Sequence, residues 1–311
     1  MDFDSSIYVA GHNGLVGSAL VRALKMHGYH NVITVERSRL DLRNQMSVKR
    51  FFAIQKPEYV FLAAAKVGGI NYNKNCPADF IYDNLAIQTN VIHSAYENRV
   101  KKLMFLGSAC IYPKVTDQPI KEEYLLTSTL EETNEGYALA KIVGLKMCQK
   151  YSEQYGFNAI SVMPANLYGI NDNFNIEQCH VIPAMIYKFH DAKMSNKKEV
   201  TLFGDGSPTR EFLHVDDLAD ALIFIMNNYN DSDHINIGSN KEYSIKELAE
   251  IVARVVGYTG KINWDVSKPN GTPRRKLDTS KLDSLGWSSS IDLEFGVDDT
   301  YGWFIENNDY L

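Results

Sequence analysis

Near its N-terminal end the chain carries the stretch Ile7-Tyr8-Val9-Ala10-Gly11-His12-Asn13-Gly14-Leu15-Val16-Gly17, in which an apolar run leads directly into three glycines. The apolar run predicts a buried strand, and the pattern that continues through Leu20 and Leu24 predicts a helix. Glycines between a strand and a helix permit a tight turn, and the free N–H groups at the start of the helix can bind a pyrophosphate. The spacing is G-x-x-G-x-x-G, and its strand-turn-helix context predicts a dinucleotide-binding site.

Strands and helices alternate beyond this stretch. Predicted strands occupy residues 31–35, 59–62, 102–106 and 157–162, and predicted helices occupy residues 45–55, 77–99 and 136–155, with a loop at 67–70. Such alternation is typical of a parallel sheet with right-handed crossovers. We therefore predict an α/β fold, a Rossmann-type doubly wound parallel sheet with a smaller C-terminal α/β substrate lobe.

The pattern changes after residue 165. A helix is predicted from Pro183, a strand at 200–203, a helix at 244–257 and a loop at 268–276, whereas the helix at 218–226 and the strand at 235–237 return to the main sheet. We assign residues 1–165, with about 214–238, to a nucleotide-binding domain. Residues of about 166–213 and 239–311 form the expected substrate-binding lobe.

The composition excludes several classes of protein. The 311 residues are 45% hydrophobic, which suffices for a sizeable core, and the net charge of −6 leaves no basic field for nucleic acid. Because the chain has neither an apolar run of roughly 20 residues nor a signal pattern, we expect no membrane association and a cytoplasmic protein. Four scattered cysteines without Cys-x-x-Cys spacing predict reduced thiols and no metal site.

The residues expected at the adenosine end of the cofactor leave its identity open. Glu36 follows the second predicted strand and could accept the ribose 2′-OH of NAD, whereas Arg37 and Arg39 could bind the 2′-phosphate of NADP. The small residues Ala63-Ala64-Ala65 end the third strand. They suit close passage of a cofactor and, equally, tight packing of a strand against a helix.

Candidate catalytic residues follow the fourth strand and begin the helix at 136–155. Tyr137 and Lys141 are four residues apart, so they share one face of that helix, and the ammonium could favour the phenolate. Ser108 and Cys110 would face one side of an extended chain at the carboxyl end of the sheet, where ligands bind. Cys110 alone would suit a buried apolar position, and His180 alone would suit the surface at a helix N-terminus.

Taken together, the motifs resemble the extended short-chain dehydrogenase/reductase family over almost the whole chain. The general signals are the glycine turn, Ser108 and Tyr137-x-x-x-Lys141. More specific segments resemble the members that act on a GDP-4-keto-6-deoxy sugar: Ala63 to Gly69, Gly107 to Pro113, Asn171 to Phe174, His180 to Pro183 and Asp216-Asp217.

This resemblance implies epimerisation at C3 and C5 followed by NADPH-dependent reduction at C4. A C4 ketone acidifies its neighbouring carbons and also accepts the hydride, so one polarising site serves every step. Ser108 and Tyr137 would hydrogen-bond the C4 oxygen, and Lys141 would support the phenolate. The resemblance implies that Cys110 is the base and His180 the acid.

The resemblance also implies binding residues for NADP(H) and for a GDP-sugar. Those for NADP(H) are Gly11, Asn13, Gly14, Leu15, Val16, Gly17, Arg37, Ala63, Ala64, Lys141, Pro164, Asn166, Leu167 and His180; those for the GDP-sugar are Lys188, Phe203, Arg210 and Asp278. Two positions depart from the family pattern, since relatives commonly have Arg at Asn13 and Trp at Phe203. Arg274 and Arg275 could contact the substrate, but a solvated loop is the preferred interpretation.

Two further expectations concern assembly and rival functions. The long helix at 77–99 covers the sheet or forms a dimer face, and we expect a homodimer. The nearest rival function is a related enzyme that acts on a dideoxy or another nucleotide keto-sugar. A dinucleotide sensor without activity is the remote rival, because such proteins usually lose the Tyr or the Lys.

Overall fold

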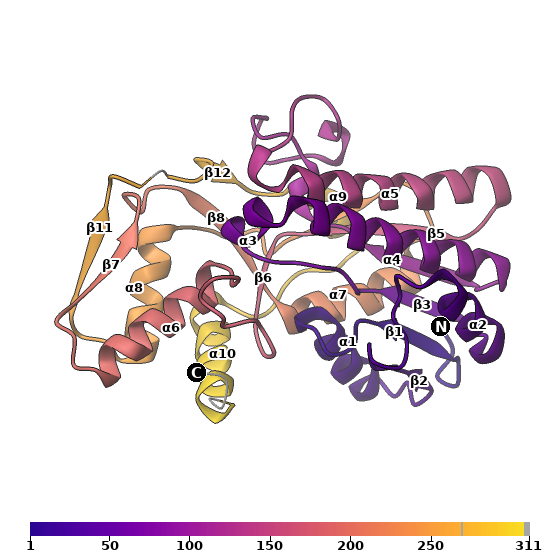
Figure 1. Ribbon diagram of the computed structural model, residues 1–311, viewed down its shortest axis with the longest axis horizontal. Helices are drawn as coiled ribbons and strands as arrows, with labels where there is room; N and C mark the ends of the chain where they lie inside the picture. Colours follow the sequence, from indigo (N-terminus) through magenta and orange to yellow (C-terminus); the bar gives the residue numbers. More distant parts are fainter. Residues whose placement is uncertain (269, 308–311) are drawn as a thin grey trace.

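Six parallel strands form the main sheet of the computed structural model, which describes residues 1–268 and 270–307 (Figure 1). Their spatial order is β2 (Val32–Ile33), β1 (Ile7–Ala10), β3 (Tyr59–Leu62), β4 (Lys102–Leu106), β5 (Ala159–Pro164) and β9 (Ile235–Ile237). The order reverses between β1 and β3, so the carboxyl ends of these two strands open a crevice for a ligand. The predicted Rossmann-type sheet is therefore confirmed.

Helices cover both faces of this sheet. On one face α1 (Leu15–Met26) packs beside α7 (Val215–Asn228); on the other lie α2 (Gln45–Gln55), α4 (Pro77–Glu97) and α5 (Glu135–Tyr155) (Figure 1). Because the strands are buried on both faces, they consist of nearly continuous apolar runs.

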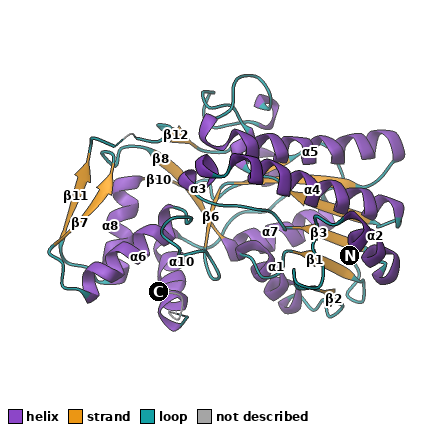
Figure 2. Cartoon of the chain, in the orientation of Figure 1, coloured by secondary structure: helices purple, strands orange, loops and turns teal. Residues whose placement is uncertain are grey.

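A smaller lobe is built around β8 (Thr209–His214). It pairs with β6 (Asn166–Tyr168), β10 (Glu242–Ser244) and β12 (Arg274–Arg275), while β7 (Glu199–Phe203) pairs with β11 (Lys261–Asp265) (Figure 2). The helices α6 (Val181–Met194), α8 (Ile245–Val256) and α10 (Leu293–Glu306) enclose a third apolar core. The predicted smaller α/β lobe is confirmed.

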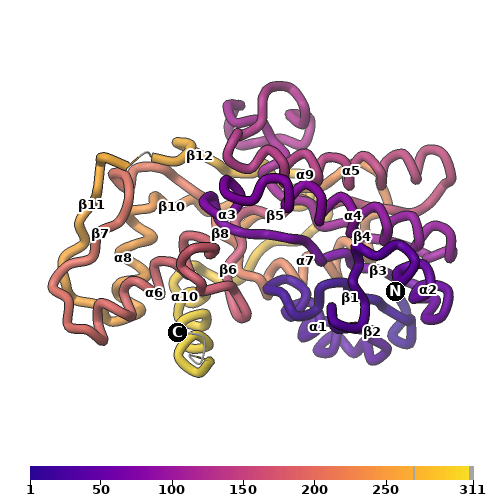
Figure 3. Tube along the Cα trace, in the orientation of Figure 1, coloured from indigo at the N-terminus to yellow at the C-terminus, as the bar shows by residue number. Residues whose placement is uncertain are grey.

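The chain passes between the two parts several times. It leaves the main sheet after β5, returns at α7 and β9, and leaves again toward β10 (Figure 3). Short elements lie along these passages: α3 (Ile70–Asn75), α9 (Ser280–Ser284), and the 3₁₀ turns η1 (Ala109–Ile111), η2 (Glu122–Tyr124) and η3 (Glu132–Asn134).

Several predicted boundaries are wrong. The strand expected at 31–35 is only two residues long, and the one expected at 157–162 runs from Ala159 to Pro164. The loop expected at 67–70 ends where α3 begins, and β6, β10, β11 and β12 were not predicted. Pro269, in the predicted loop at 268–276, lies outside the described residues. Within the described ranges, no helix combines the length and apolar character that crossing a membrane requires.

Candidate active site

The glycine turn between β1 and α1 is shaped by close contacts. Gly11 has a φ of +89°, and a Cβ built on it would lie 2.7 Å from the backbone of Ala64. A Cβ on Gly17 would overlap the carbonyl oxygen of Gly11, whereas one on Gly14 would meet nothing nearer than 3.6 Å. Gly14 is the N-cap of α1 and has no side chain, so no N-cap side chain binds the first N–H groups of α1. These features fit a bound pyrophosphate.

The alanines after β3 pack directly against this turn. Ala63 N donates to Ala10 O at 3.0 Å, and the backbone of Ala64 closely approaches Gly11. Tight packing of these alanines against the end of β1 and the glycine turn is therefore present. It also brings the end of β3 to the edge of the β1/β3 crevice.

Glu36, which follows β2, has a carboxylate that contacts side chains of the glycine turn. Glu36 Oε2 accepts a hydrogen bond from Asn13 Nδ2 at 2.7 Å, and Glu36 Oε1 lies 3.2 Å from His12 Nε2. Arg37 and Arg39 are exposed, and their side chains make no hydrogen bond within the described part of the chain. An acidic residue, Glu36, and two basic residues, Arg37 and Arg39, are therefore both present where the adenosine ribose is expected.

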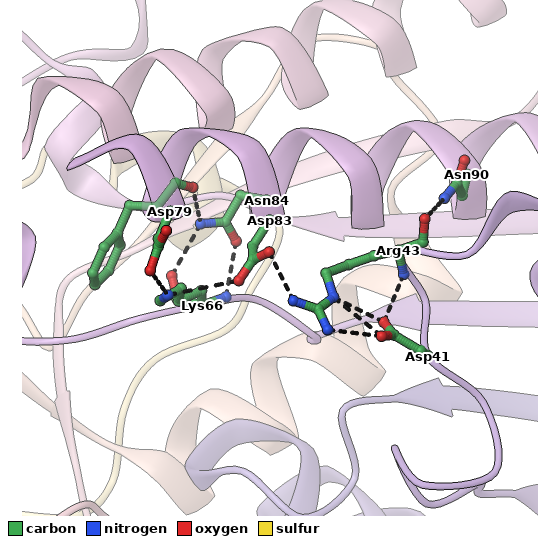
Figure 4. Close-up of polar contacts among 8 residues, drawn as sticks. Asp41, Arg43, Lys66, Asp79, Asp83, Asn84 and Asn90 are labelled. Carbon is green, nitrogen blue, oxygen red and sulfur yellow. Dashed lines mark hydrogen bonds and ion pairs between the residues drawn. The ribbon is translucent and has the colours of Figure 1, made fainter. Parts of the chain in front are cut away.

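Two asparagines of α4 hold the loops that border the crevice (Figure 4). Asn84 accepts from Lys66 N at 2.9 Å and donates to Lys66 O at 3.0 Å, while Asn90 Nδ2 donates to the carbonyls of Leu42 and Arg43. Because Asn84 and Asn90 are buried, these hydrogen bonds are protected from water. The loops after β2 and β3 are therefore anchored on one helix.

Charged side chains link the same two loops. Asp83 of α4 lies 3.0 Å from Arg43 Nη1 and 3.6 Å from Lys66 Nζ, and Lys66 also contacts Asp79 at 2.9 Å (Figure 4). The hydrogen bond from Arg43 lowers the pKa of Asp41 to about 2. The network therefore connects the loops after β2 and β3 to α4.

Tyr137 and Lys141 lie on the first turns of α5, as predicted. Lys141 is buried; its Nζ donates to Leu106 O at 2.7 Å and lies 5.8 Å from the centre of the Tyr137 ring. Burial lowers the pKa of Lys141 to about 8 and raises that of Tyr137, which a hydrogen bond to Ser108 opposes. The expected lowering of the Tyr137 pKa is not observed, because burial, the largest cause of its shift, raises this pKa and the neighbouring Cys110 raises it further. The phenol therefore keeps its proton at neutral pH.

Ser108 and Cys110 follow β4, but the extended chain predicted for them is wrong. Ser108 caps the 3₁₀ turn η1, and its Oγ accepts from Cys110 N at 3.4 Å. The turn still brings the two side chains together, since Ser108 lowers the pKa of Cys110 against the larger, opposite effect of burial. Arg275 and Lys141 also lower that pKa.

Arg275 is not in a solvated loop, which corrects the preferred interpretation of the sequence. It belongs to β12, and its Nη2 donates to Ala109 O at 2.9 Å and more weakly to Tyr112 O at 3.4 Å. Arg274 instead pairs with Glu242 at 2.7 Å and is exposed. Adjacent residues of a strand face opposite sides, so a predicted strand at Arg274-Arg275 would have indicated one inward arginine.

His180 lies at the N-terminus of α6. Its side chain forms no cap hydrogen bond and has a large accessible area, yet enough protein surrounds the imidazole to lower its pKa. Gly69 N donates to Gln178 O at 2.7 Å, which joins the loop after β3 to the segment before His180. No hydrogen bond within the described residues joins His180 to Cys110 or Tyr137.

Asp172 is a nearby group that sequence reasoning did not single out for chemistry. Its Oδ1 accepts from Asn173 N at 2.7 Å, whereas its Oδ2 is buried without a partner within the described residues. Burial raises the pKa of Asp172 to about 7; burial also raises the pKa of Cys179, and the Asp172 carboxyl raises it further. A carboxyl of this kind is partly protonated at neutral pH.

The residues expected at the substrate occupy two places in the smaller lobe. Lys188 Nζ lies 5.1 Å from the centre of the Phe203 ring, and this ring is 62% exposed. Arg210 of β8 donates to Thr209 O at 2.7 Å and is the register partner of Arg275. The Asp278 carboxylate accepts from Ser280 N at 2.9 Å, and within the described residues no hydrogen bond joins it to Lys188 or Arg210.

The residues expected at the nicotinamide end follow β5. Pro164 ends β5, and Asn166 and Leu167 begin β6. Asn166 Nδ2 donates to Glu211 O at 2.9 Å, which ties this passage to β8. Within residues 1–268 and 270–307, no group of three or more His, Cys, Asp or Glu side chains could hold a metal ion.

Comparisons with known proteins agree with this arrangement. The model of the NAD dependent epimerase/dehydratase family matches residues 7–238. The chain is 57% identical to GDP-L-fucose synthase 1 of Arabidopsis thaliana over 98% of its own length and 95% of that protein. It is 49% identical to GDP-L-fucose synthase of Escherichia coli (strain K12), with 97% of each chain covered.

A solved structure extends the agreement to three dimensions. The GDP-mannoheptose C4 reductase from Campylobacter jejuni, solved with NADP bound, superposes with a TM-score of 0.91 at 43% identity. The match covers 98% of this chain and 99% of that one. The chain therefore belongs to the NAD dependent epimerase/dehydratase family, within the extended short-chain dehydrogenases/reductases.

Proposed function

We propose that this protein is a GDP-L-fucose synthase: it converts GDP-4-keto-6-deoxy-D-mannose to GDP-L-fucose by epimerisation at C3 and C5 and NADPH-dependent reduction of the C4 ketone. The observation that carries the proposal is the full-length identity of about half or more to two proteins of that name. The cluster of Ser108, Cys110, Tyr137 and Lys141 beside a dinucleotide crevice supplies the matching chemistry.

Epimerisation requires an enolate and a proton on each face of the sugar. The C4 ketone acidifies the hydrogens at C3 and C5, and Ser108 and Tyr137 hydrogen-bond the C4 oxygen where negative charge develops. Cys110 removes the proton, and His180 donates one from the opposite face. Arg275 and Lys141 support the thiolate, because both cations act against the burial that raises the Cys110 pKa.

Reduction uses the same oxygen site. NADPH, when bound, supplies the hydride that C4 accepts. Tyr137 donates its proton to the C4 oxygen, and its raised pKa ensures that the proton is present at neutral pH. Lys141, with a pKa of about 8, remains largely charged at neutral pH and stabilises the phenolate that Tyr137 becomes.

The binding residues are assigned by the same proposal. NADPH is held by the glycine turn from Gly11 to Gly17, by Arg37, Ala63 and Ala64, and by Lys141, Pro164, Asn166, Leu167 and His180. The GDP-sugar is held by Lys188, Phe203, Arg210 and Asp278. A guanidinium fork suits phosphate oxygens, so Arg210 is assigned to the pyrophosphate, and the exposed Phe203 ring is assigned to the guanine.

We also propose the division into domains that the sequence predicts, with NADPH and the GDP-sugar held by different parts of the chain. A homodimer is supported by exposed apolar side chains on α5, where Leu139 and Val143 stand one turn apart. Light scattering after size exclusion tests this assembly, with Val143→Glu as the disrupting variant. A cytoplasmic location suits an enzyme that needs Cys110 as a free thiol.

The decisive experiment follows both reactions on one substrate. Incubation of GDP-4-keto-6-deoxy-D-mannose with NADPH in heavy water should yield GDP-L-fucose with deuterium at C3 and C5, identified by NMR. Cys110→Ser should abolish deuterium incorporation, whereas Tyr137→Phe should mainly reduce NADPH oxidation. An unchanged deuterium content in Cys110→Ser would show that another group is the base.

A second candidate is a C4 reductase that does not epimerise. The similarity to the Campylobacter jejuni GDP-mannoheptose C4 reductase favours it. NADPH oxidation without deuterium incorporation would support this candidate over the synthase. Absence of NADPH oxidation with the keto-sugar would contradict both and point to another nucleotide sugar.

A further inference from the structure

Tyr112, the residue after the 3₁₀ turn that contains Cys110, places its hydroxyl in a buried polar network. Tyr112 and Asn236 of β9 have no exposed surface, and His234 just before β9 is almost fully buried. Tyr112 Oη lies 2.6 Å from Asn236 Oδ1 and 3.0 Å from His234 Nε2. Because each hydrogen bond restricts a distance and a direction, these two contacts fix Tyr112 more strictly than apolar packing alone.

The direction of each hydrogen bond follows from Asn236. Its Nδ2 donates to Ile120 O at 3.0 Å and to Asp278 O at 3.1 Å, so its Oδ1 faces Tyr112 and only accepts. Tyr112 therefore donates its single proton to Asn236, and His234 Nε2 carries the proton that it donates to Tyr112. Burial lowers the pKa of His234 to about 4, so the imidazole is neutral at pH 7.

Asn236 also joins Tyr112 to the segment that carries Arg275. Asp278 N donates to Ile120 O at 2.8 Å, and the Asn236 amide binds the carbonyls of both residues. Arg275, three residues before Asp278, donates to the carbonyls of the Cys110 turn, that of Tyr112 included. The end of this turn is therefore held both through its backbone and through the Tyr112 hydroxyl.

A shift of Tyr112 would pass directly to Cys110. Tyr112 N donates to Ala109 O at 3.3 Å, the hydrogen bond that closes the turn η1 around Cys110. Ser108 and Arg275 lower the pKa of Cys110 only while the turn keeps the thiol near them. The position of the Tyr112 ring therefore affects both the place and the acidity of the thiol.

We propose that Tyr112 is a positioning residue for epimerisation: its hydroxyl, held by Asn236 and His234, fixes the turn η1 and with it the Cys110 sulfur. The inference rests on the proposed function only for the use of Cys110 as the base. The reactivity of Cys110 can be measured without any sugar, so the two proposals can fail separately.

The test is Tyr112→Phe, which removes one oxygen and keeps the ring. Deuterium exchange at C3 and C5 of GDP-4-keto-6-deoxy-D-mannose is followed by NMR in heavy water, with NADP⁺ in place of NADPH so that no reduction follows. We expect kcat for this exchange to fall about 10-fold while KM changes by less than about 2-fold, because the base is displaced and the substrate contacts remain.

A second readout needs no substrate. The rate at which iodoacetamide alkylates Cys110 is measured across pH by peptide mass spectrometry. In Tyr112→Phe the midpoint of this profile should move to higher pH by about 0.5, because the thiolate loses part of its contact with Ser108 and Arg275. A change in access alone alters the plateau of the profile and leaves its midpoint in place.

Tyr229→Phe is the matched control. Tyr229 is also buried, and its hydroxyl donates to Asp233 O at 2.6 Å, but among the described residues it makes no hydrogen bond to η1. Both variants lose a hydrogen bond of a buried tyrosine, so both should unfold at lower urea concentrations than the unmodified protein. Only Tyr112→Phe should change the exchange rate and the Cys110 midpoint.

His234 tests the same hydroxyl through its other partner. His234→Leu removes the donor and should lower kcat for exchange in the same direction as Tyr112→Phe. His234→Gln keeps an N–H group at the position of Nε2 and should restore most of the rate. If Tyr112→Phe does not fold, the comparison of these two His234 variants decides the question.

Two results would overturn the inference. One is an unchanged exchange rate and Cys110 midpoint in folded Tyr112→Phe, or in His234→Leu where it replaces that variant. The other is an equal loss in Tyr229→Phe. If the proposed function fails, the unmodified protein exchanges no deuterium, and the Cys110 midpoints of the same variants still decide whether Tyr112 positions the thiol.

Discussion

Arg275 shows how a single side chain connects the smaller lobe to the chemistry. Its guanidinium comes from β12 and binds two carbonyls, those of Ala109 and Tyr112, on either side of Cys110. Among the described residues, Tyr137 and Lys141 of α5 are further titratable groups that interact with Cys110. Arg275 therefore holds the 3₁₀ turn η1 by hydrogen bonds and also places a positive charge near the Cys110 thiolate.

Replacing Arg275 with Gln should raise the pKa of Cys110, because a neighbouring cation is lost, so the thiolate fraction at pH 7.5 should fall about 10-fold. The rate at which iodoacetamide alkylates Cys110, followed by peptide mass spectrometry across pH, measures this directly. Arg275→Lys keeps the charge and should restore most of the rate. Arg274→Gln, which removes an exposed neighbour, is the matched control, and an equal effect of both neutral variants would rule out a specific role for Arg275.

Asp172 should make the stability of the protein depend on pH. An unfolded Asp releases its proton near pH 4, whereas Asp172 in the folded state keeps it until about pH 7. Between these values the folded state binds more protons, so its stability falls as the pH rises, by at most about 4 kcal/mol. Urea unfolding of Asp172→Asn should show a smaller loss between pH 5 and pH 8 than the unmodified protein. Parallel curves would contradict the assignment.

At the scale of elements, the turn between β1 and α1 assigns different roles to its glycines. Gly17 has no room for a Cβ beside the Gly11 carbonyl, while Gly14 has room but stands where α1 opens toward the crevice. Gly17→Ala should therefore destabilise the fold by about 3 kcal/mol or more, measured by urea unfolding. Gly14→Ala should change stability by at most about 1 kcal/mol.

Binding separates these two variants further. Gly14→Ala should weaken NADP⁺ binding by about 10-fold or more, because its methyl group occupies the approach to the helix N-terminus. Calorimetry on the folded variant measures this loss. Tight binding by Gly14→Ala would mean that the pyrophosphate does not lie at the start of α1.

The elements that could be predicted are those whose own residues determine them. The bounds of β1, β3, β4, β9 and α2 match the predictions, because each is an apolar or amphipathic run with clear ends. In contrast β6, β10 and β12 have two or three residues and exist because each pairs with β8. The N-terminus of α3 is joined to Gln178, more than 100 residues away, and no local pattern could show that contact.

The candidate site divides in the same way. The spacing of Tyr137 and Lys141 determines that both lie on one face of α5, and the glycine turn is a local motif. The inward direction of the Arg275 side chain depends on the register between β12 and β8. The hydrogen bond of the Glu36 carboxylate depends on Asn13, which belongs to the glycine turn. Such contacts arise only when distant segments meet.

At the scale of the whole molecule, buried polar contacts join the segments that pass between the two parts. Glu211 of β8 is 1% exposed, and its two carboxylate oxygens accept from Asn240 N at 2.8 Å and from Leu277 N at 3.0 Å. Asn236 of β9 similarly donates to the carbonyls of Ile120 and Asp278. The C-terminal segment that carries Arg275 is thus held in place by side chains of β8 and β9.

Glu211→Ala should release this segment, because it leaves two buried N–H groups without acceptors. We expect a loss of about 2–4 kcal/mol in the free energy of unfolding, together with faster hydrogen exchange at Asn240 and Leu277. Since β12 lies between Asn240 and Leu277 in the chain, the alkylation profile of Cys110 should shift as it does in Arg275→Gln. Glu242→Ala on the neighbouring strand β10 is the control. It removes an acid whose partner, Arg274, is exposed, so the free energy of unfolding should fall by at most about 1 kcal/mol. If Glu211→Ala loses stability while Cys110 keeps its profile, the lobe and the catalytic turn are not coupled through this segment.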